Sequence, residues 1–228
     1  STTYVTGMAV VKTCETLRKK ICERGAEYLG CSPDDVEFDG EKVVNLKTKE
    51  EITRKEIGNK VMCSSNAPLS ATEAFSSPVS PPPFMVGIAE VEIDKETGVV
   101  EPIDYAAVVD CGTVVNPNLA RVQTEGGIAQ GIGMALYEDI IYSEKGKNYS
   151  NSFMQYKIPS RLDVGEIRVE FESSYEPTGP FGAKSIGEIV INTPSPAISN
   201  AVQNAVGVIV RELPITAEKV YKGMAEKE

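Results

Sequence analysis

Apolar residues near the start of the chain recur every three to four positions, with lysine, arginine and glutamate between them. This spacing predicts a long amphipathic helix over residues 6–29, which Thr6 can cap and Gly30 can end. A turn then leads into short alternating segments that predict a hairpin over residues 36–44, followed by a helix over residues 52–61.

Residues 63–84 break this periodicity with serine, proline and alanine, and they end in consecutive prolines. Proline fixes φ and donates no N–H group, so such a stretch cannot hold regular secondary structure. The sequence therefore predicts two lobes. We expect an N-terminal helical lobe with a short hairpin at 1–65, a Pro/Ser-rich connection at 66–84, and a second lobe at 85–228.

The second lobe begins with two alternating segments on either side of a Lys-Glu-Thr-Gly turn, which predict an antiparallel hairpin. Later segments alternate less regularly or carry helical spacing with proline in the first turn. The expected elements are strands over 85–94, 99–109, 140–142, 153–158 and 167–171, and helices over 119–137, over 197–206 and after Thr216. The mixture predicts an α+β fold with mixed or antiparallel sheets and flanking helices.

The helical pattern over 119–137 contains four glycines, each of which costs about 1 kcal/mol relative to alanine. Two explanations compete for these glycines. They allow tight packing against a neighbouring element, or they allow a ligand to approach the backbone beside Gln123 and Gln130, whose amides lie on one face of the helix and can hydrogen-bond it.

Residues 179–188 combine three glycines and a proline with a single closing carboxylate, Glu188. The glycines predict a sharply turning loop that presents this side chain. Between Ile186 and Ile189 the carboxylate would be partly desolvated and its pKa raised, as suits a general base. The alternative is a glycine-rich turn before a helix, with Glu188 as an ordinary exposed charge.

Composition argues against several classes of partner, catalytic group and metal site. The net charge of −10 disfavours nucleic acid and anionic membranes as partners, because the summed field repels phosphate. Histidine is absent, and none of the five cysteines forms a C-x-x-C pair, which argues against His-dependent triads, zinc ribbons and iron–sulfur clusters. Without an apolar run of membrane-spanning length or a signal sequence, we expect a cytoplasmic protein.

Six motifs occur in one order along the second lobe. They are the hairpin at 84–98, Asp-Cys-Gly at 110–112 with Asn-Pro at 116–117, the Gln-x-Glu-Gly-Gly-x-x-Gln-Gly-x-Gly run at 123–133, Tyr-Lys-Ile-Pro at 156–159, Gly-Ala-Lys-Ser-Ile-Gly-Glu at 182–188 and Leu-Pro-Ile-Thr at 213–216. Together they resemble the molybdenum hydroxylases, the xanthine dehydrogenase and aldehyde oxidase family. The resemblance covers nearly the whole chain and corresponds to the C-terminal part of the molybdopterin-binding subunit.

The resemblance implies chemistry at a molybdenum that carries a pterin dithiolene, an oxo, a sulfido and a hydroxyl ligand. In that family the glutamate at the position of Glu188 takes the proton of the hydroxyl as its oxygen attacks an electrophilic carbon, and hydride passes to the sulfido group. No residue of this chain is expected to ligate the metal itself. The residues that the resemblance assigns to the cofactor are Gln123, Gly126, Gly127, Gln130, Ala183, Lys184, Ser185 and Thr2.

The resemblance also implies partners. Family subunits have an N-terminal half that supplies further pterin contacts and selects the substrate, and iron–sulfur and FAD modules complete the complex. We therefore expect this chain to be a separate subunit or an excised domain that is inactive alone. Purines, N-heterocycles and aldehydes remain open as substrates, as does the nucleotide form of the pterin, including the cytosine dinucleotide. A non-catalytic assembly domain is the alternative function.

Overall fold

The computed structural model describes residues 2–64 and 68–226, which fall into two compact units, Thr2–Pro78 and a second unit that begins at Val79. The division lies inside the expected proline-rich connection. Each unit has its own buried apolar cluster.

In the first unit, a long helix packs against a small antiparallel sheet of strand order β1-β2-β3. The sheet and α2 bury Val43, Ile52, Ile57 and Val61. The elements are a π-helical turn at Thr2–Thr6, α1 at Gly7–Leu29, a 3-10 turn at Pro33–Asp35, β1 at Val36–Phe38, β2 at Lys42–Asn45, β3 at Glu51–Thr53 and α2 at Arg54–Met62.

The ends of these helices follow local capping chemistry, with one exception. Gly30 ends α1 in the left-handed conformation at φ 66°, as expected for a helix C-terminus. Thr53 and Glu56 form a capping box at the start of α2, so the helix begins at Arg54 rather than at residue 52. Thr6 makes no capping hydrogen bond, because the chain enters α1 from the π-helical turn instead of from an extended residue.

The proline-rich stretch is partly anchored to the first unit. Lys20 Nζ donates to the carbonyl of Ser70 (2.6 Å), Thr16 Oγ1 donates to Glu73 (2.8 Å), and the hydroxyls of Tyr4 and Ser77 share a hydrogen bond (2.9 Å). Side chains spaced along α1 and the turn before it therefore hold a segment that lacks secondary structure.

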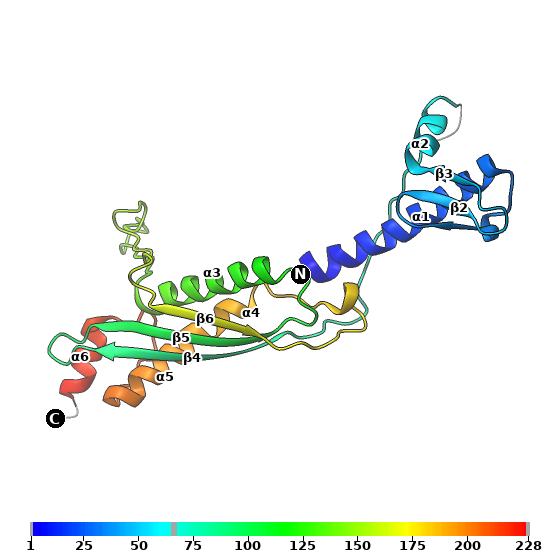
Figure 1. Cartoon of the computed structure of the whole chain (residues 1–228). Helices are drawn as coiled ribbons and strands as arrows, with labels where there is room; N and C mark the ends of the chain where they lie inside the picture. The colour runs from blue at the N-terminus through cyan, green and yellow to red at the C-terminus, as the bar shows by residue number, and fades with distance from the viewer. Residues whose placement is uncertain (1, 65–67, 227–228) are drawn as a thin grey trace. The chain divides into compact units, whose positions relative to one another are not determined.

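The second unit contains a three-stranded sheet of order β4-β5-β6, with β4 and β5 antiparallel and β5 and β6 parallel. Figure 1 shows these strands side by side, with α3 and α5 running along them. The elements are β4 at Phe84–Ile93, β5 at Val100–Asp110, α3 at Pro117–Leu136, β6 at Glu166–Phe171, a 3-10 turn at Pro180–Gly182, α4 at Ile189–Asn192, α5 at Pro194–Val206 and α6 at Ala217–Ala225. The predicted α+β class with antiparallel and mixed sheets is confirmed.

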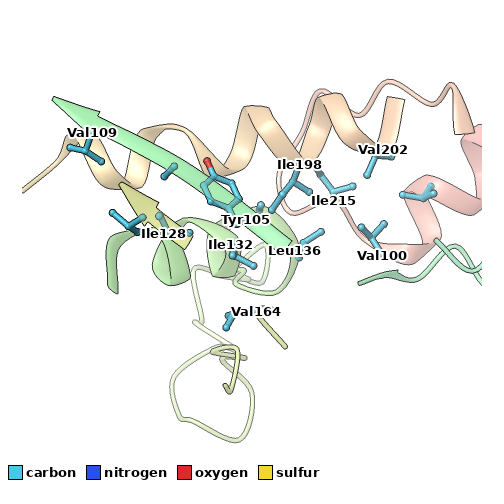
Figure 2. Close-up of a cluster of buried hydrophobic side chains, with 14 of the residues drawn as sticks. Val100, Tyr105, Val109, Ile128, Ile132, Leu136, Val164, Ile198, Val202 and Ile215 are labelled. Atoms are coloured by element: carbon cyan, nitrogen blue, oxygen red, sulfur yellow. The ribbon is translucent and has the colours of Figure 1, made fainter. Parts of the chain in front are cut away.

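The main core fills the space between the sheet and the helices α3 and α5 (Figure 2). This buried cluster includes Tyr105 and Val109 of β5, Ile128 and Ile132 of α3, and Ile198 of α5. These side chains are almost fully buried. The core fixes α3 against the sheet, and α3 is the helix that carries Gln123 and Gln130.

Two predicted strands are wrong. Residues 140–142 form only an isolated bridge between Tyr142 and Asn148, and residues 153–158 form turns, with the Tyr156 N–H bonded to the Ser152 carbonyl (2.8 Å). Apolar alternation alone does not make a strand when no neighbour pairs with it. The apolar side chains of Phe153 and Met154 are 85% and 80% exposed, so this segment adds neither of them to a core.

The helices give no indication of a membrane span. Across residues 2–64 and 68–226, none has both the length and the apolar character that crossing a bilayer requires.

One polar pair lies at the boundary between the core and α5, and it supports a stability prediction. Burial raises the pKa of Tyr105, and its hydroxyl donates to Thr193 Oγ1 (2.8 Å). We expect Thr193→Val to cost about 1–3 kcal/mol of unfolding free energy, because it leaves the buried hydroxyl without its acceptor. In urea unfolding, the double variant Tyr105→Phe/Thr193→Val should lose less than the sum of the single variants. Strict additivity would contradict the coupling.

Candidate active site

The loop that presents Glu188 begins in a tight turn. At Pro180–Gly182 the backbone of Phe181 (φ 53°) and Gly182 (φ 87°) is left-handed. A side chain on Gly182 would lie 2.4 Å from the Tyr175 ring and 2.6 Å from Thr113, so this position requires glycine. The glycine-rich composition thus reflects a close backbone turn, as the sequence predicts.

This loop is joined to the end of β5 by backbone hydrogen bonds. Gly112 and Ala183 form an antiparallel bridge. The Lys184 N–H donates to the carbonyl of Cys111 (2.8 Å), and the Thr113 N–H donates to that of Gly182 (2.9 Å). Two of the sequence motifs, at 110–112 and 182–188, therefore lie side by side although about 70 positions separate them.

The Asp110 carboxylate sits at this junction and has three donors. Lys184 Nζ (2.8 Å), Ser174 Oγ (2.6 Å) and the Gly112 N–H (2.9 Å) all bond to it. Burial by itself would raise the pKa of Asp110, but these hydrogen bonds outweigh it and hold the pKa below its usual value. Asp110 is therefore ionised at neutral pH and paired with the Lys184 ammonium.

Beyond this junction the loop delivers Glu188 to the start of α4, which packs against α3. A side chain on Gly127 would lie 2.2 Å from Val190, and one on Gly131 would lie 2.6 Å from Pro194. These two glycines therefore allow α3 to approach α4 and the start of α5. The packing explanation accounts for them.

Gly126 differs, because a side chain there would meet nothing within 4 Å. It borders a hollow of about 440 Å³. The lining residues are Val122, Gln123, Gly126, Gly127 and Gln130 from α3, and Gly187, Glu188 and Ile191 from the loop and α4. Five of the residues singled out in the sequence, Gln123, Gly126, Gly127, Gln130 and Glu188, thus meet around one open space.

The other assigned residues lie outside this lining. Ala183 is buried at the bridge to Gly112, and the Lys184 side chain is turned towards Asp110. Ser185 follows in the same segment, and Thr2 belongs to the first unit. The assignment of these four residues to a cofactor stays a prediction.

The Glu188 side chain is exposed, which agrees with the alternative of an exposed charge and differs from the expected desolvated carboxylate. Its apolar neighbours turn away from it, since Val190 is fully buried and Ile186 packs against the main core. Sequence proximity to these residues therefore does not provide burial. Within the described part of the chain, no donor is hydrogen-bonded to this carboxylate, so both oxygens are available in the hollow.

Sequence reasoning missed the apolar side of the hollow and the anchor of the loop. Ile191 lies one helical turn after Glu188, a spacing that would have indicated a shared face. Val122 adjoins Gln123 and carried no such signal. The hydrogen bond between Ser174 and Asp110 joins positions 64 apart, and the sequence around neither residue predicts it.

In the ranges that the structure covers, no group of three or more His, Cys, Asp or Glu side chains is placed to hold a metal ion. The hollow instead offers amide groups, a carboxylate and open backbone, which can bind or act on a polar group that enters it.

The fold and the order of the six motifs place the chain in one class of proteins. The chain belongs to the molybdenum hydroxylase family, since its residues 1–165 match the family model described as a molybdopterin cofactor-binding domain. The resemblance inferred from the six motifs is confirmed.

Individual relatives agree. The chain is 35% identical to the probable hypoxanthine oxidase XdhD of Escherichia coli K12, an alignment that covers 98% of this chain and 24% of that protein. It is 30% identical to the 6-hydroxypseudooxynicotine dehydrogenase complex subunit gamma of Paenarthrobacter nicotinovorans, covering 96% of this chain and 29% of the relative. Among solved structures, quinoline 2-oxidoreductase from Pseudomonas putida 86 matches with a TM-score of 0.83 and 26% identity, over 99% of this chain and 30% of that one.

The chain thus spans a quarter to three-tenths of the length of these relatives. The activities in the relatives' names belong to those longer proteins.

Proposed function

We propose that this chain is the C-terminal molybdopterin-binding portion of a molybdenum-dependent hydroxylase and that Glu188 is its general base. The observation that carries the proposal is the hollow itself. It brings a carboxylate from the loop before α4 together with Gln123 and Gln130 from α3, although about 60 positions separate the two segments.

The residues present fit such a cofactor. The backbone at Gly126 opens onto space in which a side chain would touch nothing, so a bound group can approach the helix there. The Gln123 and Gln130 amides can both donate and accept hydrogen bonds, as a polar pterin with its oxygen-rich substituents requires. When bound, the molybdenum cofactor supplies the redox chemistry by which a substrate carbon is hydroxylated.

The residues of the chain have separate roles in this proposal. Gln123 and Gln130 orient the bound group through their amides. Glu188 accepts a proton at its carboxylate, whose oxygens no other described residue occupies. Val122 and Ile191 provide apolar walls that limit water once the hollow is covered. Because Glu188 is exposed in this chain, the cover must come from the bound group or from a partner.

The proposal includes partners and substrate. An N-terminal half of the molybdenum-binding subunit completes the site, and iron–sulfur and FAD modules accept the electrons. The names of the relatives support a purine or another N-heterocycle as substrate, since they refer to hypoxanthine, a nicotine derivative and quinoline. An aldehyde is the further candidate, supported by the aldehyde oxidoreductase subunit PaoC of Escherichia coli K12, which is 29% identical.

Gln123 gives a direct test of cofactor binding. We expect Gln123→Leu in the holoenzyme to weaken retention of the cofactor about tenfold, because a lost hydrogen bond in a partly closed site costs about 1–3 kcal/mol. Molybdenum and pterin content after dialysis would measure it. Gln203→Leu is the matched control, because Gln203 is an exposed glutamine on α5 outside the hollow. Equal cofactor content in both variants would contradict the role of Gln123.

A further inference from the structure

The ion pair between Lys184 and Asp110 differs from the others in the described residues, because both of its side chains are shielded. Their exposed fractions are 10% and 20%, whereas each of the other described pairs has at least one partner above half exposure. Exposed pairs contribute little, since water and salt screen them. A shielded pair with its remaining lone pairs satisfied holds one geometry instead.

The pair connects the rigid part of the unit to the loop. Asp110 is the last residue of β5, and Ser174 lies in the segment that follows β6, so the carboxylate is bonded to the chain beyond the neighbouring strand. Lys184 belongs to the loop and donates to Oδ2 of this carboxylate, whereas Ser174 and the Gly112 N–H donate to Oδ1. The Lys184 N–H also bonds to the Cys111 carbonyl, so the main chain and the side chain of one residue both attach the loop to the sheet.

Glu188 lies four residues beyond this attachment. Between them, Ile186 packs against the core. Gly187 faces open space, and as a glycine it leaves the backbone conformationally free. On the far side, Val190 seats α4 against Gly127 of α3. Two attachments therefore flank the carboxylate, and they compensate for a glycine that would otherwise let it swing out of the hollow.

We propose that Lys184 and Asp110 are positioning residues that hold Glu188 in the hollow. The inference rests on the proposed function of Glu188. It predicts an effect on the chemical step with little effect on binding, because neither side chain of the pair lines the hollow.

The test uses the holoenzyme that contains this chain. We expect Lys184→Met to lower kcat by about 10- to 100-fold, the size of loss that a misplaced catalytic group produces. KM and molybdenum content should stay near those of the parent, which separates positioning from loss of binding. Loss of molybdenum from Lys184→Met would instead support the cofactor contact that the resemblance implies for Lys184 and would overturn the positioning role. Lys184→Arg keeps the charge and should recover part of the loss. Hydrogen exchange of the peptide covering residues 179–188 should be faster in Lys184→Met.

Asp104→Asn is the matched control, because Asp104 also lies on β5 and pairs with an arginine, Arg168, whose side chain is 60% exposed. This variant should keep the parental kcat. If Lys184→Met does not assemble, Asp110→Asn, which removes the negative charge of the pair, and Ser174→Ala, which removes one donor to Asp110, carry the test. Parental kcat in both overturns the proposal. Turnover retained in Glu188→Gln would reject the assignment of the base. An inactive Glu188→Gln beside a fully active Lys184→Met rejects only the positioning role.

Discussion

Glu188→Gln should lower the kcat of the holoenzyme by about 10²- to 10⁴-fold, the usual contribution of a positioned general base. Glutamine keeps the size and the carbonyl oxygen of glutamate but cannot take up a proton at neutral pH. Because the Glu188 side chain makes no hydrogen bond that supports the described fold, the variant should retain its structure. Molybdenum content and KM should therefore stay close to those of the parent, and steady-state kinetics with metal analysis would measure both.

Two further variants test whether the loss of kcat in Glu188→Gln is specific to this position and to the carboxylate. Glu172→Gln changes an exposed carboxylate directly after β6, outside the hollow, and should leave kcat unchanged. Glu188→Asp keeps the charge but shortens the side chain. Its kcat should lie between those of the parent and of Glu188→Gln, because the carboxylate is then farther from the reacting group. A holoenzyme that turns over normally with glutamine at this position would leave the chain with a binding or assembly role.

Local chemistry made many elements of the fold predictable. The hairpin of β4 and β5 was predicted from two alternating segments on either side of a turn. The shift of its register between Glu90 and Val91 was not predicted. The last helix starts where Thr216 accepts the Lys219 N–H (3.3 Å), and α3 starts where Asn116 accepts the Leu119 N–H (3.1 Å). Each signal lies within a few residues of the feature that it predicts.

Contacts between distant positions were not predictable. β6 pairs in parallel with β5, although α3 and the loop between Leu136 and Glu166 separate the two strands in the sequence. The same holds for the junction at Asp110, whose partner Lys184 lies 74 positions away. A single sequence records the residue types but not these distances.

The candidate site divides in the same way. The glycine-rich loop and the amide-bearing helix were identified from composition, and the structure brings Gln123 and Glu188 to one hollow. The sequence left open whether Glu188 is desolvated or exposed, because its burial depends on which way Ile186 and Val190 point. Those directions are set by the packing of α4 on α3, which is a tertiary property.

Gly126 and Gly127 are adjacent in sequence but should respond oppositely to alanine. A side chain on Gly127 would lie 2.2 Å from Val190 Cγ2 and 3.3 Å from its backbone carbon, so α4 would have to move. We expect Gly127→Ala to cost about 3 kcal/mol of unfolding free energy, at the upper end of the range for overpacking. At Gly126 the new methyl group meets nothing, and Gly126→Ala should stabilise the helix by about 1 kcal/mol.

The same pair separates packing from ligand binding. Urea unfolding of the chain measures the stability difference, and molybdenum content of the holoenzyme measures access to the hollow. If the cofactor approaches the backbone at Gly126, Gly126→Ala should reduce metal content even as it stabilises the fold, because the methyl group occupies the open space. A stabilised variant with full metal content would place the cofactor elsewhere. Gly127→Ala moves the start of α4 and with it Glu188, so it should lose turnover together with stability.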